Sequence, residues 1–102
     1  MINIRTIKRL KNDEGITLKN GKPISYKTGY QVATEGIETA SASQAIQAVR
    51  NYKGNCGVWY NKGIYYVDKC HRISNREKAV QVGKAHKQLS IFKWSDKSLI
   101  WC

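Results

Sequence analysis

Aromatic residues are the part of this sequence best suited to a binding chemistry, and the first group lies around one short loop. The stretch Val58-Trp59-Tyr60 is followed by Asn61-Lys62-Gly63 and then by Ile64-Tyr65-Tyr66-Val67. A three-residue loop that ends in Gly predicts a β-hairpin. With such a loop Trp59 pairs with Tyr65, and both side chains lie on one face of the sheet. The opposite face then carries Val58, Tyr60, Ile64 and Tyr66.

The second aromatic group predicts a similar hairpin, from residues 88–94 to 98–101, in which Phe92 and Trp94 share one face. The two helices predicted for this chain can cover only one face of the sheet, so we expect the other face to expose aromatic side chains. Such side chains, when ringed by Lys and Arg, bind single-stranded nucleic acids, and each stacked base contributes about 1–3 kcal/mol. The alternative is that both faces are buried, by the N-terminal segment or by a second copy of the chain.

The charge of the chain favours a polyanionic partner. It has 18 Lys and Arg against 7 Asp and Glu, a net charge of +11 on 102 residues. Positive charge of this size attracts nucleic acids, so a nucleic acid or a nucleoprotein is the expected partner; solubility alone is the alternative. The residues predicted to contact phosphates or an acidic surface, or to stack, are Lys8, Arg9, Lys11, Trp59, Lys62, Tyr65, Lys69, Arg72, Arg76 and Trp94.

Thiols and imidazoles give little sign of a metal or cofactor site. Structural zinc usually takes closely spaced ligand pairs, and Cys56, Cys70, Cys102, His71 and His86 form none. No cofactor and no catalytic residue is therefore expected. An odd number of cysteines without close pairing indicates a reducing compartment, which predicts a cytoplasmic protein.

A small metal-dependent nuclease or hydrolase is the runner-up function. Metal-dependent nucleases need converging carboxylates, which Glu35, Glu38 and Asp68 would supply, with His71 beside them. The usual spacing of such acids is missing. The glycines are expected at turns and caps, without phosphate-loop spacing. A structural homodimer is the third interpretation.

Two helices should position these side chains. Ser41-Ala42-Ser43-Gln44 and Ser74-Asn75-Arg76-Glu77 both fit a capping box. They predict helices over residues 42–53 and 75–87, and Gly54 suits the C-cap of the first.

The strands complete an α+β fold, with two helices packed on a mainly antiparallel sheet. Asn20-Gly21 predicts a type I′ hairpin turn, and Pro23 puts its strand at a sheet edge. A shift of 33 residues lays Ser41 on Ser74, which suggests tandem strand–helix–hairpin units. We expect a single domain over residues 1–102, with a basic N-terminal arm at 1–15 and a core at 16–102.

Neither a membrane nor a secretory pathway is indicated. No apolar run approaches the roughly 20 residues of a membrane span. The first five residues, from Met1 to Arg5, hold no uninterrupted apolar stretch, so they do not read as a secretory signal.

Two local patterns resemble small uncharacterised proteins of bacteriophages and mobile elements of Gram-positive bacteria. They are Gly54–Tyr60 running into Gly63–Asp68, and Gly83-Lys84 followed by Gln88–Phe92. The resemblance covers about residues 28–102, and its motifs are structural, so no functional residue is carried over. It implies a host-defence inhibitor, for example an anti-CRISPR protein with a CRISPR nuclease as its partner.

Overall fold

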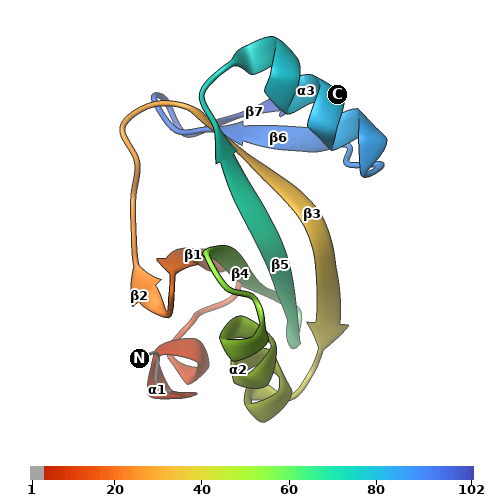
Figure 1. The fold of residues 1–102 in the computed structure, drawn as a ribbon. Helices are drawn as coiled ribbons and strands as arrows, with labels where there is room; N and C mark the ends of the chain where they lie inside the picture. Colours follow the sequence, from red (N-terminus) through yellow and green to blue (C-terminus); the bar gives the residue numbers. More distant parts are fainter. Residues whose placement is uncertain (1–3) are drawn as a thin grey trace.

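The computed structural model describes residues 4–102, which form one seven-stranded sheet and three helices (Figure 1). The predicted α+β class is confirmed. In chain order the elements are α1 (Ile4–Lys8), β1 (Glu14–Lys19), β2 (Lys22–Pro23), β3 (Tyr30–Thr39), α2 (Ala42–Asn51), β4 (Asn55–Asn61), β5 (Ile64–Ile73), α3 (Arg76–Ala85), β6 (Ser90–Lys93) and β7 (Ser98–Trp101).

The sheet is antiparallel throughout and has the strand order β2-β1-β4-β5-β3-β6-β7. The long strands β3 and β5 pair at its centre. Helix α2 leads from β3 to β4, which pairs with β5, and α3 leads from β5 to β6, which pairs with β3. Each helix is therefore followed by a strand that pairs with the strand preceding the other helix. In Figure 1, α2 lies at the lower end of β3 and β5, and α3 lies at the upper end.

The units repeat at 34 residues rather than at the predicted 33. Helix α2 begins at Ala42 after its N-cap Ser41, whose side chain accepts from the backbone N–H of Gln44, as predicted. Helix α3 begins at Arg76, because its N-cap is Asn75 and not Ser74. The prediction of a capping box from Ser74 is wrong, since Asn caps a helix as well as Ser does and stands one residue later.

Replacement of Asn75 tests this assignment. The Asn75 side chain accepts from the Lys78 backbone N–H at 2.9 Å, and loss of such a bond typically costs about 1 kcal/mol. Asn75→Ala should lower the free energy of unfolding in urea by about that amount. Ser74→Ala is the matched control and should change the unfolding free energy by less than about 0.5 kcal/mol. Equal losses in the two variants would contradict the assignment.

The core has two parts on the same face of the sheet, which we call the helix face. Under α2, the buried side chains include Leu18, Val58 and Val67; under α3 they include Val32 and Ile91.

The segment predicted as an N-terminal arm belongs to the same core. Ile7 of α1 is fully buried against the α2 cluster, and the predicted boundary at residue 15 falls inside β1. Residues 1–3 of that segment lie outside the described residues. The arm is therefore part of the domain over the range that the structure describes.

The turns decide which side chains share a face. Asn20 and Gly21 adopt φ values of 50° and 80°, and β2 with Pro23 lies at the end of the sheet; both predictions are confirmed. The β4–β5 turn differs, because Lys62 (φ 51°) and Gly63 (φ 81°) make a two-residue turn that pairs Asn61 with Ile64.

The predicted pairing of Trp59 with Tyr65 is therefore wrong by one residue. Tyr60 lies opposite Tyr65, and Trp59 lies opposite Tyr66. A two-residue turn with positive φ at both positions matches the right-handed twist of the strands better than the predicted loop. Tyr65 consequently joins Val58 in the core of the helix face. Tyr66 takes the position beside Trp59 that was predicted for Tyr65.

Candidate functional site

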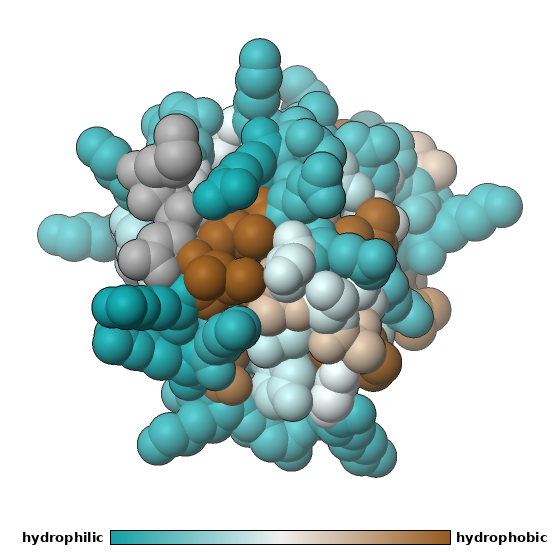
Figure 2. Space-filling view, turned by 90° about the horizontal axis from the view of Figure 1, so that it is seen from below, coloured by the Kyte–Doolittle hydropathy of each residue, from teal (hydrophilic) through white to brown (hydrophobic). Residues whose placement is uncertain are grey.

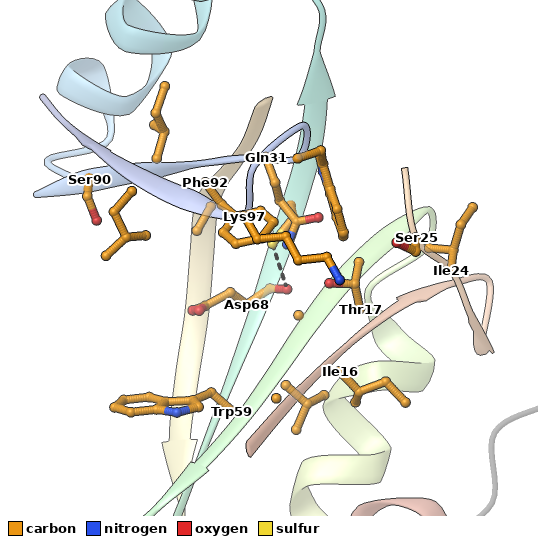
Figure 3. A pocket seen from close by; sticks show the side chains of 18 of the residues that line it. Ile16, Thr17, Ile24, Ser25, Gln31, Trp59, Asp68, Ser90, Phe92 and Lys97 are labelled. Carbon is orange, nitrogen blue, oxygen red and sulfur yellow. Dashed lines mark hydrogen bonds between the residues drawn. The ribbon is translucent and has the colours of Figure 1, made fainter. Parts of the chain in front are cut away.

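The face of the sheet opposite the helices holds an open cavity of about 1060 Å³ (Figure 3). Residues from all seven strands line it, because the sheet curls around this face. We call it the trough; its floor is formed by Gln31, Ala33, Gly57, Asp68 and Cys70 on the three adjacent strands β3, β4 and β5.

The floor of the trough is low because glycines occupy the positions on both sides of Asp68 in the sheet. Gly57 of β4 and Gly36 of β3 are the two cross-strand neighbours of Asp68. At Gly36 a Cβ atom would clash with the Asp68 carboxylate and would lie 2.8 Å from the carbonyl oxygen of Val67. At Gly57 the nearest atom to a Cβ would be Cys70 Sγ, at 3.5 Å. A Cβ atom at Gly57 would therefore make only ordinary van der Waals contacts.

One wall of the trough is the segment between β2 and β3, which is anchored at both sides. The Tyr26 hydroxyl donates to Asn55 Oδ1 (3.0 Å). The Tyr26 ring packs edge-on against the Trp94 ring, with ring centroids 5.4 Å apart. Arg72 donates to the carbonyl oxygen and the hydroxyl of Thr28 (3.1 and 3.0 Å) and lies over the Tyr26 ring. Arg72, predicted as a phosphate contact, thus holds this wall in place.

The opposite wall comes from β6, β7 and the turn between them, with Phe92, Leu99 and Lys97. In Figure 3 the Lys97 side chain extends from this turn toward the side where Thr17 lies. Phe92 and Trp94 pack edge-on, with ring centroids 4.9 Å apart. This wall is therefore aromatic, with one cation at its rim.

Two buried polar atoms of residues that line the trough have no hydrogen-bond partner among residues 4–102. They are the acceptor Gln31 Oε1 and the donor Trp94 Nε1. An unsatisfied buried group costs about 1–3 kcal/mol, so such atoms point to a ligand or to water. Figure 3 shows the Gln31 side chain reaching into the trough above Asp68.

Burial disfavours the charged forms of the titratable groups of the floor. Burial raises the pKa of the Asp68 carboxyl, and the Glu38 carboxylate raises it further. Burial, with a smaller effect of Asp68, raises the pKa of Cys70 to about 12 and that of Cys56 on the helix face likewise to about 12. These thiols are protonated near neutral pH and are poor nucleophiles.

The predicted aromatic residues have three different environments. Trp59 lines the trough, is 40% exposed and stacks on Tyr66 with ring centroids 5.0 Å apart. Its indole N–H donates to Asp13 Oδ1 (3.1 Å). Trp94 also lines the trough but is only 7% exposed, and Tyr65 is equally buried on the helix face. Trp59 and Tyr66 are thus the pair available for stacking.

Four of the predicted cations lie at one end of the molecule. Lys8 is in α1, with Arg9 and Lys11 just after it, and the backbone N–H of Lys62 donates to Asn12 Oδ1 (2.6 Å). Figure 2 views this end and shows hydrophilic side chains projecting on all sides. The structure therefore brings Lys11 and Lys62 into one region.

The other predicted cations lie apart from these. Lys69 pairs across the strands with Glu35 on the helix face, and Arg76 is the first residue of α3. Lys97, three residues after Trp94 in the sequence, lines the trough.

The residues of the nuclease interpretation do not meet. Asp68 and Glu38 lie on the trough face, and alternation along β3 and β5 puts Glu35 and His71 on the helix face. Within residues 4–102 no group of three or more His, Cys, Asp or Glu side chains is placed to hold a metal ion.

Gln31 and Gly57 were missed as site residues by the sequence analysis. The prediction that glycines serve turns and caps is wrong for Gly15, Gly36 and Gly57, which lie inside strands. A glycine inside a strand often marks a close approach of another group. That signal was present in the sequence and points to the trough.

Comparison with known proteins gives no further guide to this site. No protein-family model, curated protein or solved structure matches the chain. Among the described residues no helix is long and apolar enough to cross a membrane.

Proposed function

We propose that this chain is a non-enzymatic binding protein that holds single-stranded nucleic acid in the trough. The observation that carries the proposal is the trough itself, an aromatic cavity of about 1060 Å³ on a protein of net charge +11. Unstacked bases offer their flat faces to aromatic side chains, and their phosphates are attracted by the surrounding cations.

The size and lining of the trough support a strand rather than a duplex. Ligand cavities for small molecules range from about 300 to 1000 Å³, so this one has room for more than one base. Bases paired in a duplex keep their faces stacked on each other and cannot reach Trp59 or Phe92 inside the trough. Duplex binding would instead require a basic outer surface, and the predicted cations are spread over several faces.

Fluorescence anisotropy with labelled oligonucleotides tests the proposal. Single-stranded DNA or RNA should bind more tightly than a duplex of the same length. With six phosphate contacts, affinity should fall roughly 300-fold between 50 and 200 mM salt. Equal or tighter binding of the duplex would contradict the proposal, as would no binding of single strands at low salt.

Replacement of Trp59 should weaken this binding through lost stacking. Trp59→Ala is expected to reduce the affinity for single strands about tenfold or more, because one stacked base contributes about 1–3 kcal/mol. The salt dependence should stay the same, since no phosphate contact is removed. Trp59→Phe keeps an aromatic ring and should retain most of the affinity. Circular dichroism must show that both variants keep the native fold.

A nucleoprotein is the second candidate partner, and an exposed apolar area favours it. Leu89, Leu99 and Trp101 are exposed, Trp101 by 71%, and two of them lie on β7 at the edge of the sheet. A protein strand could pair with this open edge while the trough holds nucleic acid.

The role of a host-defence inhibitor, which the phage-type resemblance implies, stays a prediction. A pull-down with guide-loaded and empty CRISPR nucleases tests it. Retention of the guide-loaded form alone would support it, and retention of neither form would contradict it.

A further inference from the structure

A carboxylate in the trough of so basic a protein has no role in stacking or in phosphate binding. Asp68 lies between Gly57 and Gly36, and its carboxylate lies over Gly36. Among residues 4–102 the structure shows no hydrogen bond or salt bridge to this carboxylate. A group that repels phosphates is therefore kept, without a partner, on the surface proposed to bind nucleic acid.

The polar groups near Asp68 are acceptors and donors without a hydrogen-bond partner among residues 4–102. The side-chain amide of Gln31 reaches over Gly57, where its nitrogen would lie 3.6 Å from a Cβ atom. Gly57 and Gly36 are the cross-strand neighbours of Asp68, so the amide lies over one neighbour of Asp68 and the carboxylate over the other. Gln31 Oε1 adds an unpartnered acceptor, and Trp94 Nε1 adds an unpartnered donor.

Guanine is the base whose edge complements this set. Its ring N1–H and its amino group at C2 are adjacent donors, which fit the two acceptor oxygens of one carboxylate. Its carbonyl oxygen O6 is an acceptor for an indole N–H. Thymine and uracil offer a single ring donor. Adenine and cytosine place an acceptor nitrogen beside their amino group, where it would face the second carboxylate oxygen.

We infer that the trough selects guanine, with Asp68 accepting from N1–H and the amino group and with Gln31 and Trp94 completing the contacts. The inference rests on the proposed function. To that function it adds a preference for one base, and it names Asp68 as the residue that causes the preference. Such a preference is read from an unstacked Watson–Crick edge, as is typical of the recognition of single strands.

The test uses thymidine oligonucleotides that carry one substituted base at the centre. Wild-type protein should bind the oligonucleotide with guanine about tenfold more tightly than the all-thymidine one, as one bidentate base contact gives. Hypoxanthine lacks the amino group of guanine and should give an intermediate affinity. Asp68→Asn should abolish the preference for guanine and, because it removes a negative charge from the trough, should strengthen binding of the all-thymidine oligonucleotide.

Glu38→Gln is the matched control, because it removes the same charge from an exposed neighbour that does not line the trough. It should leave the preference for guanine intact. Equal binding of all bases by the wild-type protein would overturn the inference and leave the proposed function standing. A preference that survives Asp68→Asn would also overturn it. Failure to bind any single strand would overturn the function and the inference together.

Discussion

The Gly57→Val protein should fold normally and lose about tenfold to hundredfold of its affinity for single-stranded nucleic acid, the equivalent of one excluded base. Gly57 lies inside β4, and a Cβ atom there meets nothing closer than Cys70 Sγ at 3.5 Å, an ordinary van der Waals distance. Valine suits a strand better than glycine. The isopropyl group would occupy the floor of the trough beside Asp68, where a base must lie.

The measurement is anisotropy at one salt concentration, combined with urea unfolding of the same variant. The free energy of unfolding should stay equal or rise by up to about 1 kcal/mol. Gly36→Ala is the contrasting variant. Its Cβ would clash with the Asp68 carboxylate and with the Val67 carbonyl, so it should cost about 1–3 kcal/mol of stability. A stable Gly57→Val protein with wild-type affinity would show that nucleic acid does not lie in the trough.

Local patterns were enough to predict the fold class, but the register of one hairpin required a distant contact. The sequence Asn61-Lys62-Gly63 is compatible with a loop of two or of three residues. In the structure the Lys62 backbone N–H donates to Asn12 Oδ1, 50 residues away in the chain, and Lys62 adopts a positive φ. No rule based on neighbouring residues could include that bond.

The candidate site was less predictable than the fold, because the trough depends on the strand order. Trp59 and Trp94 were predicted as binding residues from the aromatic pattern alone, and both line the cavity. That Gly57 and Gly36 lie on either side of Asp68 follows only from the order β4-β5-β3. In the chain, a helix separates each of these strands from one of the strands it pairs with. The sequence alone did not define which strands would become neighbours across the helices.

Alanine at the two adjacent tyrosines of β5 should act on different properties, mainly on stability at Tyr65 and mainly on binding at Tyr66. Tyr65 is 7% exposed, packs on Tyr60 with ring centroids 4.6 Å apart, and has a pKa raised by burial and by Tyr60. Tyr65→Ala should lower the free energy of unfolding by about 3 kcal/mol, as large-to-small changes of buried rings do. Tyr66 is half-buried on the trough face, and Tyr66→Ala should cost only about 1 kcal/mol through its contact with Trp59.

Binding of single strands separates the two tyrosines further. Tyr66 supports the exposed Trp59 ring, so Tyr66→Ala should weaken binding severalfold in a protein that remains folded. Tyr65→Phe keeps the buried ring and should bind like the wild type, with a change in stability below about 1.5 kcal/mol. Urea unfolding and anisotropy on the three variants make the comparison. If Tyr65→Ala lost binding and kept its stability, the side chain of Tyr65 would face the ligand, and the strands would pair as in the three-residue loop.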